Sequence, residues 1–245
     1  MPDAPLVSVI VPTYNERENV VRLIRLIHEL MTKDGIPYEV VVVDDNSPDG
    51  TAEAARALAG LYKVRVIVRQ AKLGLSSAVL EGFRSARGVY LAVMDADLQH
   101  PPEALPDMVK KVAGGCDVVI GSRYVRGGST PGWSLARRVV SRVAGLVAKV
   151  LLPRVRGVKD TMSGYFVIRR EVIEGITLNP RGFKILLEIL VKGRYERVCE
   201  HPIEFRAREW GESKLGAGEI LDYVLHVLDL AHETVLDLVC RLLLE

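Results

Sequence analysis

The sequence predicts an α/β fold with a mostly parallel central sheet and helices on both faces. Runs of β-branched residues alternate with segments whose apolar residues recur at helical spacing, which is typical of repeated strand–helix units. One strand, at residues 40–43, is entirely valine, as expected for a strand buried on both sides. Crossovers between parallel strands return each helix onto the sheet.

The first half of the chain supplies five predicted strands in regular order. Residues 6–11 are rich in β-branched side chains, and residues 16–31 carry an apolar stripe at helical spacing. Residues 44–50 form a dense turn signal after the strand at 40–43. The other expected elements are helices at 51–61, 75–86 and 103–112 and strands at 64–68, 89–93 and 118–121.

The second half is less regular. Helices are expected at residues 133–152 and 183–191, a strand at 198–205 and a loop at 208–214. A long final helix at 219–244 carries one narrow, mostly acidic polar stripe. Its wide apolar face indicates packing against the preceding domain, a small membrane subunit or another copy.

Composition limits the classes of protein. A chain of 245 residues fits one domain, or one domain with an appendage, and a net charge of +2 argues against a whole-protein nucleic-acid binder. Residues 118–159 nevertheless contain arginines and lysines and no acidic residue. Such a block indicates an anion-facing surface.

Three scattered cysteines show neither metal-type spacing nor a disulfide framework, which predicts a reducing cytosol. Neither a signal peptide nor a transmembrane stretch is apparent. Glutamine and asparagine are scarce beside arginine, glutamate and lysine, a composition that points to a high-temperature source.

Two carboxylates and an amide follow the predicted strand at 89–93: Asp95, Asp97 and Gln99. In an extended chain alternate residues share a face, so the three side chains can point at one spot. Hard oxygen ligands suit Mg²⁺ or Mn²⁺, and open α/β sheets bind ligands beyond the carboxyl ends of their strands. The alternative is a turn or a helix N-cap, and this segment alone does not decide between them.

A dinucleotide-binding domain requires a Gly-x-Gly-x-x-Gly turn after the first strand. Here Pro12-Thr13-Tyr14-Asn15-Glu16 stands at that point, so this interpretation fails. Six motifs, the first of which includes this segment, occur in order along nearly the whole chain. They are Val9-Ile10-Val11-Pro12-Thr13-Tyr14-Asn15-Glu16, Val43-Asp44-Asp45-Asn46-Ser47-Pro48-Asp49-Gly50-Thr51, Met94-Asp95-Ala96-Asp97-Leu98-Gln99-His100-Pro101, Gly121-Ser122-Arg123-Tyr124, Ser163-Gly164-Tyr165 and Gly211-Glu212-Ser213-Lys214.

Together these motifs resemble the family 2 glycosyltransferases and, more narrowly, the dolichol-phosphate mannose synthases. The resemblance implies a GT-A type, Rossmann-like domain over residues 1–216, followed by an amphipathic helix at 217–245. The donor nucleotide sugar is then expected at Pro12, Tyr14, Glu16, Val43, Asp45, Asp95, Ala96, Asp97, Arg123, Arg208 and Lys214.

The same resemblance implies catalytic roles for Asp97, Arg123 and Arg137. Asp97 and Gln99 would hold Mg²⁺ or Mn²⁺, and Arg123 and Arg137 would bind the acceptor phosphate. Such a phosphate monoester has a second pKa near ~6, so it needs orientation and charge compensation more than a general base. His100 is expected to be structural rather than a ligand.

The implied reaction transfers mannose from GDP-mannose to a polyprenyl (dolichyl) phosphate with inversion, giving the β-linked product. One alternative is a relative that uses UDP-glucose or another sugar nucleotide with the same acceptor. A second is a non-catalytic subunit that binds the sugar nucleotide or the lipid phosphate.

A polyprenyl acceptor lies in a bilayer, and residues 133–156 combine an apolar face, a basic polar face and a leading Trp133. This segment predicts peripheral association with the cytoplasmic face of a membrane, with Trp133 as the interface anchor. The alternative is an ordinary packed helix with a solvated basic side. A small membrane-anchor subunit or self-association is the expected partner besides donor, acceptor and membrane.

Overall fold

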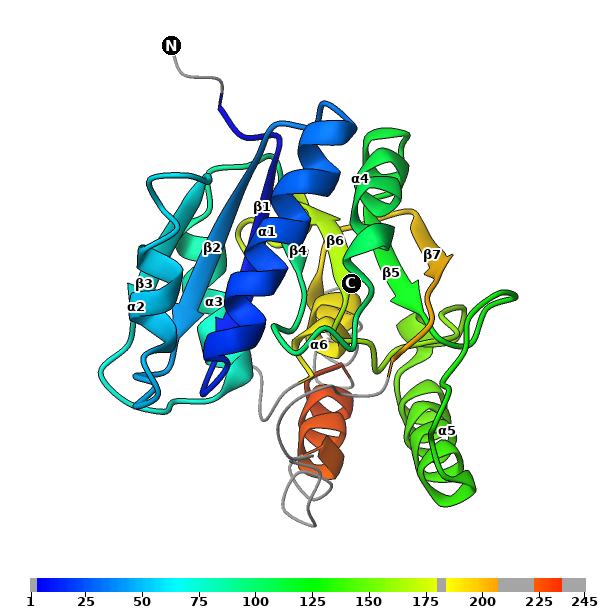
Figure 1. Ribbon diagram of the computed structural model, residues 1–245. Coiled ribbons are helices and arrows are strands. Elements are labelled where there is room, and N and C mark those ends of the chain that lie inside the picture. Colours follow the sequence, from blue (N-terminus) through cyan, green and yellow to red (C-terminus); the bar gives the residue numbers. More distant parts are fainter. Residues whose placement is uncertain (1–3, 180–183, 207–222, 235–245) are drawn as a thin grey trace.

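A computed structural model describes residues 4–179, 184–206 and 223–234. Its centre is a seven-stranded sheet in the order β3-β2-β1-β4-β6-β5-β7 (Figure 1). β6 runs antiparallel to both of its neighbours, and the other pairings are parallel. The strands are β1 (Val7–Thr13), β2 (Tyr38–Asp44), β3 (Val64–Val68), β4 (Tyr90–Val93), β5 (Val118–Ser122), β6 (Phe166–Arg169) and β7 (Val198–Pro202).

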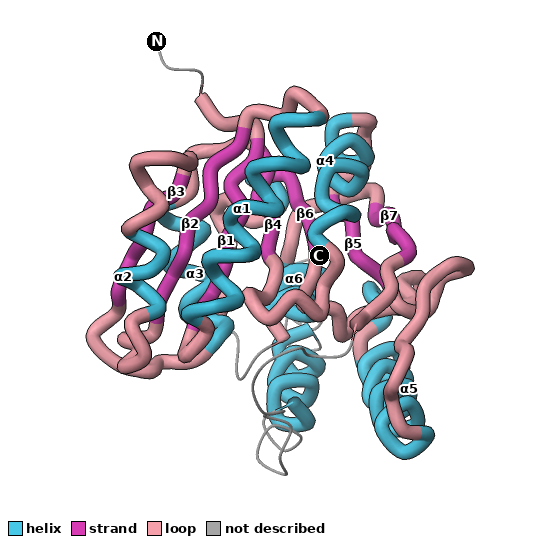
Figure 2. The backbone as a smooth tube through the Cα atoms, in the orientation of Figure 1, coloured by secondary structure: helices cyan, strands magenta, loops and turns pink. Residues whose placement is uncertain are grey.

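Helices cover both faces of the sheet, as predicted (Figure 2). Helices α1, α2 and α4 contribute to one core cluster, and α3, α5, α6 and the helix at residues 223–234 contribute to the other. The helices are α1 (Arg17–Lys33), α2 (Thr51–Arg56), α3 (Leu75–Ser85), α4 (Leu105–Ala113), α5 (Leu135–Leu151) and α6 (Ile185–Lys192), with short 3₁₀ turns at Pro102–Ala104, Pro153–Val155 and Arg170–Val172.

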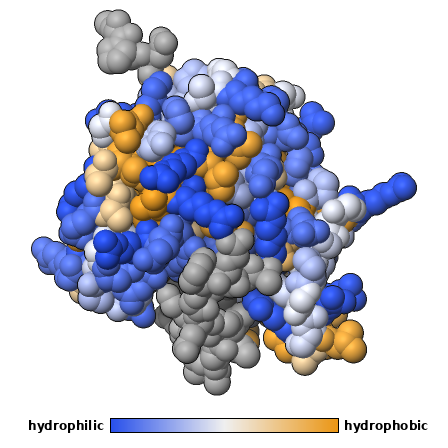
Figure 3. All heavy atoms as spheres, in the orientation of Figure 1, coloured by the Kyte–Doolittle hydropathy of each residue, from blue (hydrophilic) through white to orange (hydrophobic). Residues whose placement is uncertain are grey.

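Helix α5 projects from one end of the sheet (Figure 1). Ser134 caps its start, because its side chain accepts the backbone N–H of Arg137 at 3.2 Å. Of its own residues only Ala148 is buried. Figure 3 shows apolar side chains gathered on it at the lower right. The large apolar side chains that α5 exposes are Leu135, Val139, Val140, Val143, Leu146, Val147, Val150 and Leu151.

The helix at residues 223–234 packs on the domain, within the long final helix that the sequence predicts. Tyr223 donates its hydroxyl hydrogen to the carbonyl of Ala144 at 2.6 Å, and Val227 and Leu230 are buried in the core. The rest of that predicted helix lies outside the described residues. No described helix combines the length and hydropathy needed to cross a bilayer.

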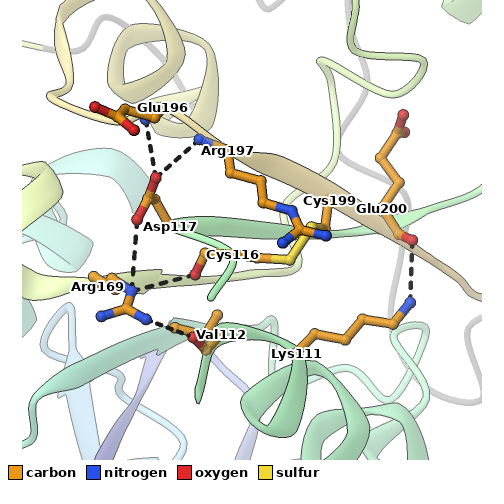
Figure 4. The surroundings of a disulfide bond; sticks show 9 residues. All are labelled: Lys111, Val112, Cys116, Asp117, Arg169, Glu196, Arg197, Cys199 and Glu200. Atoms are coloured by element: carbon orange, nitrogen blue, oxygen red, sulfur yellow. Dashed lines mark hydrogen bonds and ion pairs between the residues drawn. A yellow bond between two sulfur atoms is a disulfide. The ribbon is translucent and has the colours of Figure 1, made fainter. Parts of the chain in front are cut away.

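The expectation that the cysteines form no disulfide is wrong for two of them. Cys116, just before β5, is bonded to Cys199 in β7, and their Cα atoms lie 6.0 Å apart (Figure 4). The two are 83 residues apart in sequence. Only the pairing of β5 with β7 brings them together, so spacing along the chain carries no sign of the bond.

Candidate active site

Most of the predicted site residues lie where β1, β2 and β4 end, at the edge of the sheet where open α/β folds bind ligands. Each of the three following loops contains a residue other than glycine in the left-handed region. These residues are Asn15, Asn46 and Leu98, with φ values of 58°, 57° and 58°. Such a conformation is uncommon outside glycine, and unusual backbone of this kind concentrates at functional sites.

The loops after β1 and β2 are joined by hydrogen bonds. The backbone N–H of Asn15 donates to Ser47 Oγ at 2.9 Å, and that of Glu16 donates to Thr51 Oγ1 at 3.0 Å. The Glu16 carboxylate accepts the Asn19 amide at 2.7 Å. The first two motifs therefore form one continuous wall. Pro12 and Val43 are buried behind it, and Tyr14 lies at its surface with Lys72 Nζ 4.3 Å from the ring centroid.

Asp45 is almost fully buried and its carboxylate has several partners. Arg69 pairs with one oxygen, and the backbone N–H groups of Leu73 and Gly74 donate to the other at 3.0 and 2.9 Å. Asp45 therefore ties the turn after β2 to the start of α3. Sequence reasoning missed Arg69, whose only local signal is an arginine directly after a strand.

The loop after β4 differs from the extended chain that the sequence argument assumed. The strand ends at Val93, residues 96 and 97 form a turn, and Leu98 has a positive φ. Asp97 Oδ1 accepts the Gln99 backbone N–H at 3.1 Å, so the aspartate also shapes the turn. Alternation along a strand is therefore the wrong reason for grouping Asp95, Asp97 and Gln99.

Gln99 is held from a distant part of the chain. Its side-chain Nε2 donates to the Arg206 carbonyl at 3.1 Å, and the Arg206 backbone N–H donates to the Gln99 carbonyl at 2.9 Å. With Nε2 engaged, the amide oxygen is the ligand atom that Gln99 can offer. Asp97 is 5% exposed and lies two residues away. One carboxylate and one amide oxygen fit Mg²⁺ or Mn²⁺ bound largely by substrate phosphates, and no larger His, Cys, Asp or Glu cluster occurs in the described ranges.

His100 is structural, as expected. It is 2% exposed, and burial lowers its pKa to about 4, so the ring is neutral at pH 7. Nδ1 accepts the Asp95 backbone N–H at 3.3 Å, and the ring packs against Tyr165 and Phe205, each with its centroid 5.3 Å away. His100 thereby fixes the start of the Asp95–Asp97 turn.

The Ser163-Gly164-Tyr165 motif packs behind this turn. Ser163 Oγ donates to the Gly121 carbonyl at 2.7 Å. A Cβ atom on Gly164 would stand 3.3 Å from the His100 ring and 3.5 Å from an Asp95 carboxylate oxygen. A glycine there lets the chain approach the turn closely. The motif thus joins the loop after β4 to the motif that begins at Gly121.

Arg123 is buried against Asp160, a partner that sequence reasoning missed. Its Nε and Nη2 donate to the two carboxylate oxygens at 2.8 and 2.7 Å, a bidentate pair. Burial opposes both charges, but Asp160 outweighs it and raises the Arg123 pKa, and Arg123 lowers the Asp160 pKa. Within the described residues Nη1 takes no part in this pairing. The one local signal was that Asp160 ends the acid-free block.

Strand β7 holds the loop that carries Asp160. Glu200 accepts the backbone N–H groups of Lys159 and Asp160 at 2.9 and 3.0 Å. Cys199, whose disulfide ties β7 to the start of β5, is the residue before Glu200. A chain of contacts therefore runs from the disulfide to Arg123.

Arg137 reaches the site from the first turn of α5. Its guanidinium carbon lies 4.2 Å from the Trp133 ring centroid, and that of Arg123 lies 5.3 Å from the same centroid. Phe205 meets the Trp133 ring edge to face at 5.5 Å. The predicted interface anchor is therefore a half-buried residue of the site, with its ring against two arginines.

Lys184 is a further charged group that the sequence argument did not use. It donates to the Met162 carbonyl at 2.8 Å. The residue as a whole is partly exposed, but its ammonium lies inside, and burial followed by the Arg123 charge lowers its pKa to about 7. Arg208 and Lys214, the predicted diphosphate-binding residues, lie outside the described residues.

A basic cleft of about 520 Å³ opens between α5 and the loop after β5. Four cationic side chains and no carboxylate line it, so it favours an anionic ligand. Its lining consists of Arg123, Tyr124, Val125, Gly128, Ser141, Arg142, Gly145, Leu146, Lys149, Lys159 and Met162.

The fold and these motifs are those of a glycosyltransferase. The sequence model of the family described as glycosyl transferase family 2 matches residues 8–177. The chain belongs to this family. Its curated relatives include the dolichol-phosphate mannosyltransferase of Pyrococcus furiosus, 50% identical over 221 residues, which are 90% of this chain and 62% of that protein. The chain thus spans less than two thirds of that relative.

Two fungal relatives match more of their own length. The dolichol-phosphate mannosyltransferase of Saccharomyces cerevisiae is 41% identical over 91% of this chain and 86% of that protein. The Mycosarcoma maydis protein of the same name is 39% identical over 92% and 79%.

Among solved structures, glucosyl-3-phosphoglycerate synthase from Mycobacterium tuberculosis shares the fold. Its complex with Mn²⁺, UDP-glucose and phosphoglyceric acid superposes with a TM-score of 0.70 at 20% identity, covering 93% of this chain and 80% of that one. Its complex with Mg²⁺ and UDP gives 0.69 at 18% identity over 93% and 80%. The predicted GT-A architecture is confirmed by this likeness and the seven-stranded sheet.

Proposed function

We propose that this protein transfers mannose from GDP-mannose to a polyprenyl (dolichyl) phosphate with inversion at the anomeric carbon. The observation that supports this most strongly is the 50% identity to a dolichol-phosphate mannosyltransferase across 90% of the chain. The six motifs that carry the resemblance all fall within the chain, and the described ones meet at one edge of the sheet.

The donor occupies the wall formed by the first two motifs and the turn after β4. Asp97 and Gln99 hold Mg²⁺ or Mn²⁺, which stabilises the negative charge that develops on the departing nucleoside diphosphate. Tyr14, Glu16 and Asp45 orient the nucleotide, with Asp95 and Ala96 beside it. Arg208 and Lys214 add positive charge to the diphosphate.

The acceptor is a phosphate that is already largely dianionic at neutral pH, because its second pKa lies near ~6. The site therefore supplies orientation and charge compensation rather than a strong base. Arg123 keeps Nη1 for this task while Asp160 fixes its other nitrogens. Arg137 binds the same phosphate from α5, whereas Arg123 lies in the loop after β5. The cleft lined by Arg142 and Lys149 extends the positive surface along α5.

The lipid tail requires a position at a bilayer. Helix α5 exposes an apolar face, with Leu135, Val143 and Val150 at 77, 52 and 63% exposure, beside basic residues of the acid-free block. This face lies against the cytoplasmic side of an anionic membrane. A small anchor subunit or a second copy remains a predicted partner. We propose a high-temperature source as well, because the composition points to one. The disulfide is then compatible with that side, since intracellular proteins of hyperthermophiles carry such bonds.

The test is transfer of labelled mannose from GDP-mannose to a polyprenyl phosphate in detergent, with and without EDTA, and with UDP-glucose in parallel. Formation of a mannosyl lipid that EDTA abolishes is the expected result. Transfer from UDP-glucose alone would refute the mannose donor. Retention of labelled nucleotide without turnover would support the binding subunit instead.

A matched pair of variants tests the acceptor role. Arg137→Ala is expected to raise the acceptor KM about 10-fold or more, because a charge-assisted hydrogen bond is lost. Arg138→Ala, the exposed neighbour on the same helix, should leave it within about twofold. Equal effects of the two changes would contradict the assignment of Arg137.

A further inference from the structure

Trp133 stands where the two proposed acceptor arginines meet. The Arg137 and Arg123 guanidinium carbons lie 4.2 and 5.3 Å from its ring centroid, both within the ~6 Å over which a cation is attracted to an aromatic face. The two arginines come from different parts of the fold, one from the loop after β5 and one from α5. The indole is the surface that they share.

Two contacts position the Arg123 guanidinium: the Asp160 carboxylate and the Trp133 ring. The ring also contacts Arg137 and so links the two arginines. Asp160 binds the Arg123 guanidinium in a bidentate pair, and that pair is fixed through Glu200 to β7. Arg137 begins on a helix that projects from the domain. The Trp133 ring is a contact that both guanidinium groups share, so it contributes to where Arg137 lies relative to Arg123.

The indole also offers a donor of its own. Trp133 Nε1 is buried, and no acceptor for it occurs among the described residues. Leaving a buried N–H without a partner costs about 1–3 kcal/mol. In a site lined by cations, an anionic ligand oxygen is the acceptor that would satisfy it.

The ring also contacts the part of the fold that supports the proposed metal site. Phe205 packs edge to face on Trp133 at 5.5 Å and on His100 at 5.3 Å. The next residue, Arg206, exchanges hydrogen bonds with Gln99. The rings of Trp133, Phe205 and His100 thus form a row of contacts from the two arginines to the turn after β4. The distance between the acceptor and donor sites therefore depends on Trp133.

We infer that Trp133 is a positioning residue for the acceptor phosphate: its ring fixes the spacing of Arg123 and Arg137, and its Nε1–H donates to a phosphate oxygen. This inference rests on the proposed function, because the phosphate is that of the polyprenyl acceptor. Removing the indole therefore weakens acceptor binding and leaves the binding of the nucleotide sugar unchanged.

Two substitutions separate the parts of this role. Trp133→Phe keeps an aromatic face and loses the N–H, and it is expected to raise the acceptor KM about 10-fold, the effect of one hydrogen bond to a charged oxygen. Trp133→Leu removes the face as well and should raise it roughly fivefold further. The donor KM should stay within about twofold of the parent value for both, since donor residues keep their contacts.

The matched control is Tyr195→Leu, which removes the cation–π contact between Tyr195 and Arg154 at 5.0 Å. Tyr195 lies just before β7 begins, whereas Arg123 follows the other end of β5, the parallel neighbour of β7. It should leave the acceptor KM unchanged. Circular dichroism and nucleotide titration show whether each variant is folded. A folded Trp133→Leu protein with an acceptor KM within twofold of the parent would refute the inference.

Binding without turnover supplies an independent readout. The chain has two tryptophans, Trp133 and Trp210, so Trp210→Phe leaves Trp133 as the sole indole emitter. Titration of this variant with polyprenyl phosphate, in the absence of donor, should change its emission saturably. Non-phosphorylated polyprenol should not. An emission that stays constant while acceptor binds, measured by equilibrium partition of labelled lipid, would overturn the inference.

The two proposals fail separately. If the parent transfers no mannose but Trp133 emission responds to the lipid phosphate, the proposed reaction fails and the positioning role stands. Only the positioning role fails if the parent transfers mannose, replacement of Trp133 leaves the acceptor KM unchanged, and Trp133 emission does not respond to the lipid phosphate.

Discussion

Replacing both Cys116 and Cys199 by alanine is expected to lower the stability of the protein by several kcal/mol. The bond closes a loop of 83 residues, and the chain-entropy relation gives about 4.5 kcal/mol for a loop of that length. For a chain of this size each kcal/mol corresponds to roughly 2–4 °C in Tm. The variant should therefore unfold roughly 9–18 °C below the parent.

The assay is thermal unfolding followed by far-UV circular dichroism, with the parent measured both oxidised and reduced. Reduction should lower the Tm of the parent toward that of the double variant and leave the variant unchanged. Cys240→Ala is the matched control, because it removes the third cysteine and should change little. Counting thiols in denaturant should give one for the oxidised parent and three after reduction.

Two results would refute this reasoning. Three reactive thiols in the oxidised parent would mean that the bond does not form. A bond that forms but changes Tm by less than about 2 °C would mean that closing the loop contributes little, because the unfolded chain is already compact or the native bond is strained.

Three further outcomes are expected. Asp97→Asn should reduce transfer at least about 100-fold without changing Tm by more than a few degrees, and an active variant would remove Asp97 from the mechanism. The His100 pKa of about 4 lies below its unfolded value of 6.5, so unfolding takes up a proton between these values and the parent should lose about 3 kcal/mol as pH falls from 6.5 to 4. His100→Phe should flatten that part of the stability profile in urea titrations, and an equally steep profile would contradict the assignment. Val143→Glu on the exposed face of α5 should weaken binding to anionic vesicles about 10-fold in a sedimentation assay, whereas Leu61→Glu, at a more exposed position outside α5, should not.

Much of the fold follows from local pattern. The apolar stripe of α1 and the valine run of β2 indicate which side chains are buried. The type of each element, and a sheet with helices on both faces, were therefore predictable. The ends of the elements were less predictable. The helix expected at residues 51–61 ends at Arg56, and turns follow it to residue 61. The four-residue β6 was missed, because it is short, lies just after the Ser-Gly-Tyr motif and runs antiparallel, against the βαβ rhythm.

The site was predictable as a set of motifs and not as a set of contacts. Resemblance placed Arg123 in the site, but the end of the acid-free block at Asp160 is the one local sign of its partner. That sign does not show that Asp160, 37 residues later, pairs with the Arg123 guanidinium. The strand before Asp95 ends at Val93, as predicted, but the chain then turns at residues 96 and 97 instead of staying extended. The role of Trp133 depends on a second arginine and on Phe205, all brought together by tertiary packing.

The antiparallel strand β6 has a consequence for how such a chain can be divided. It lies between β4 and β5, so the sheet consists of a parallel block β3-β2-β1-β4 and a second block joined to it through one reversed strand. Most proposed donor residues precede position 98, and both proposed acceptor arginines follow position 121. A chimaera that crosses over after α4 would therefore keep the proposed donor residues up to Asp97 and exchange both acceptor arginines, together with Arg208 and Lys214 of the proposed diphosphate site.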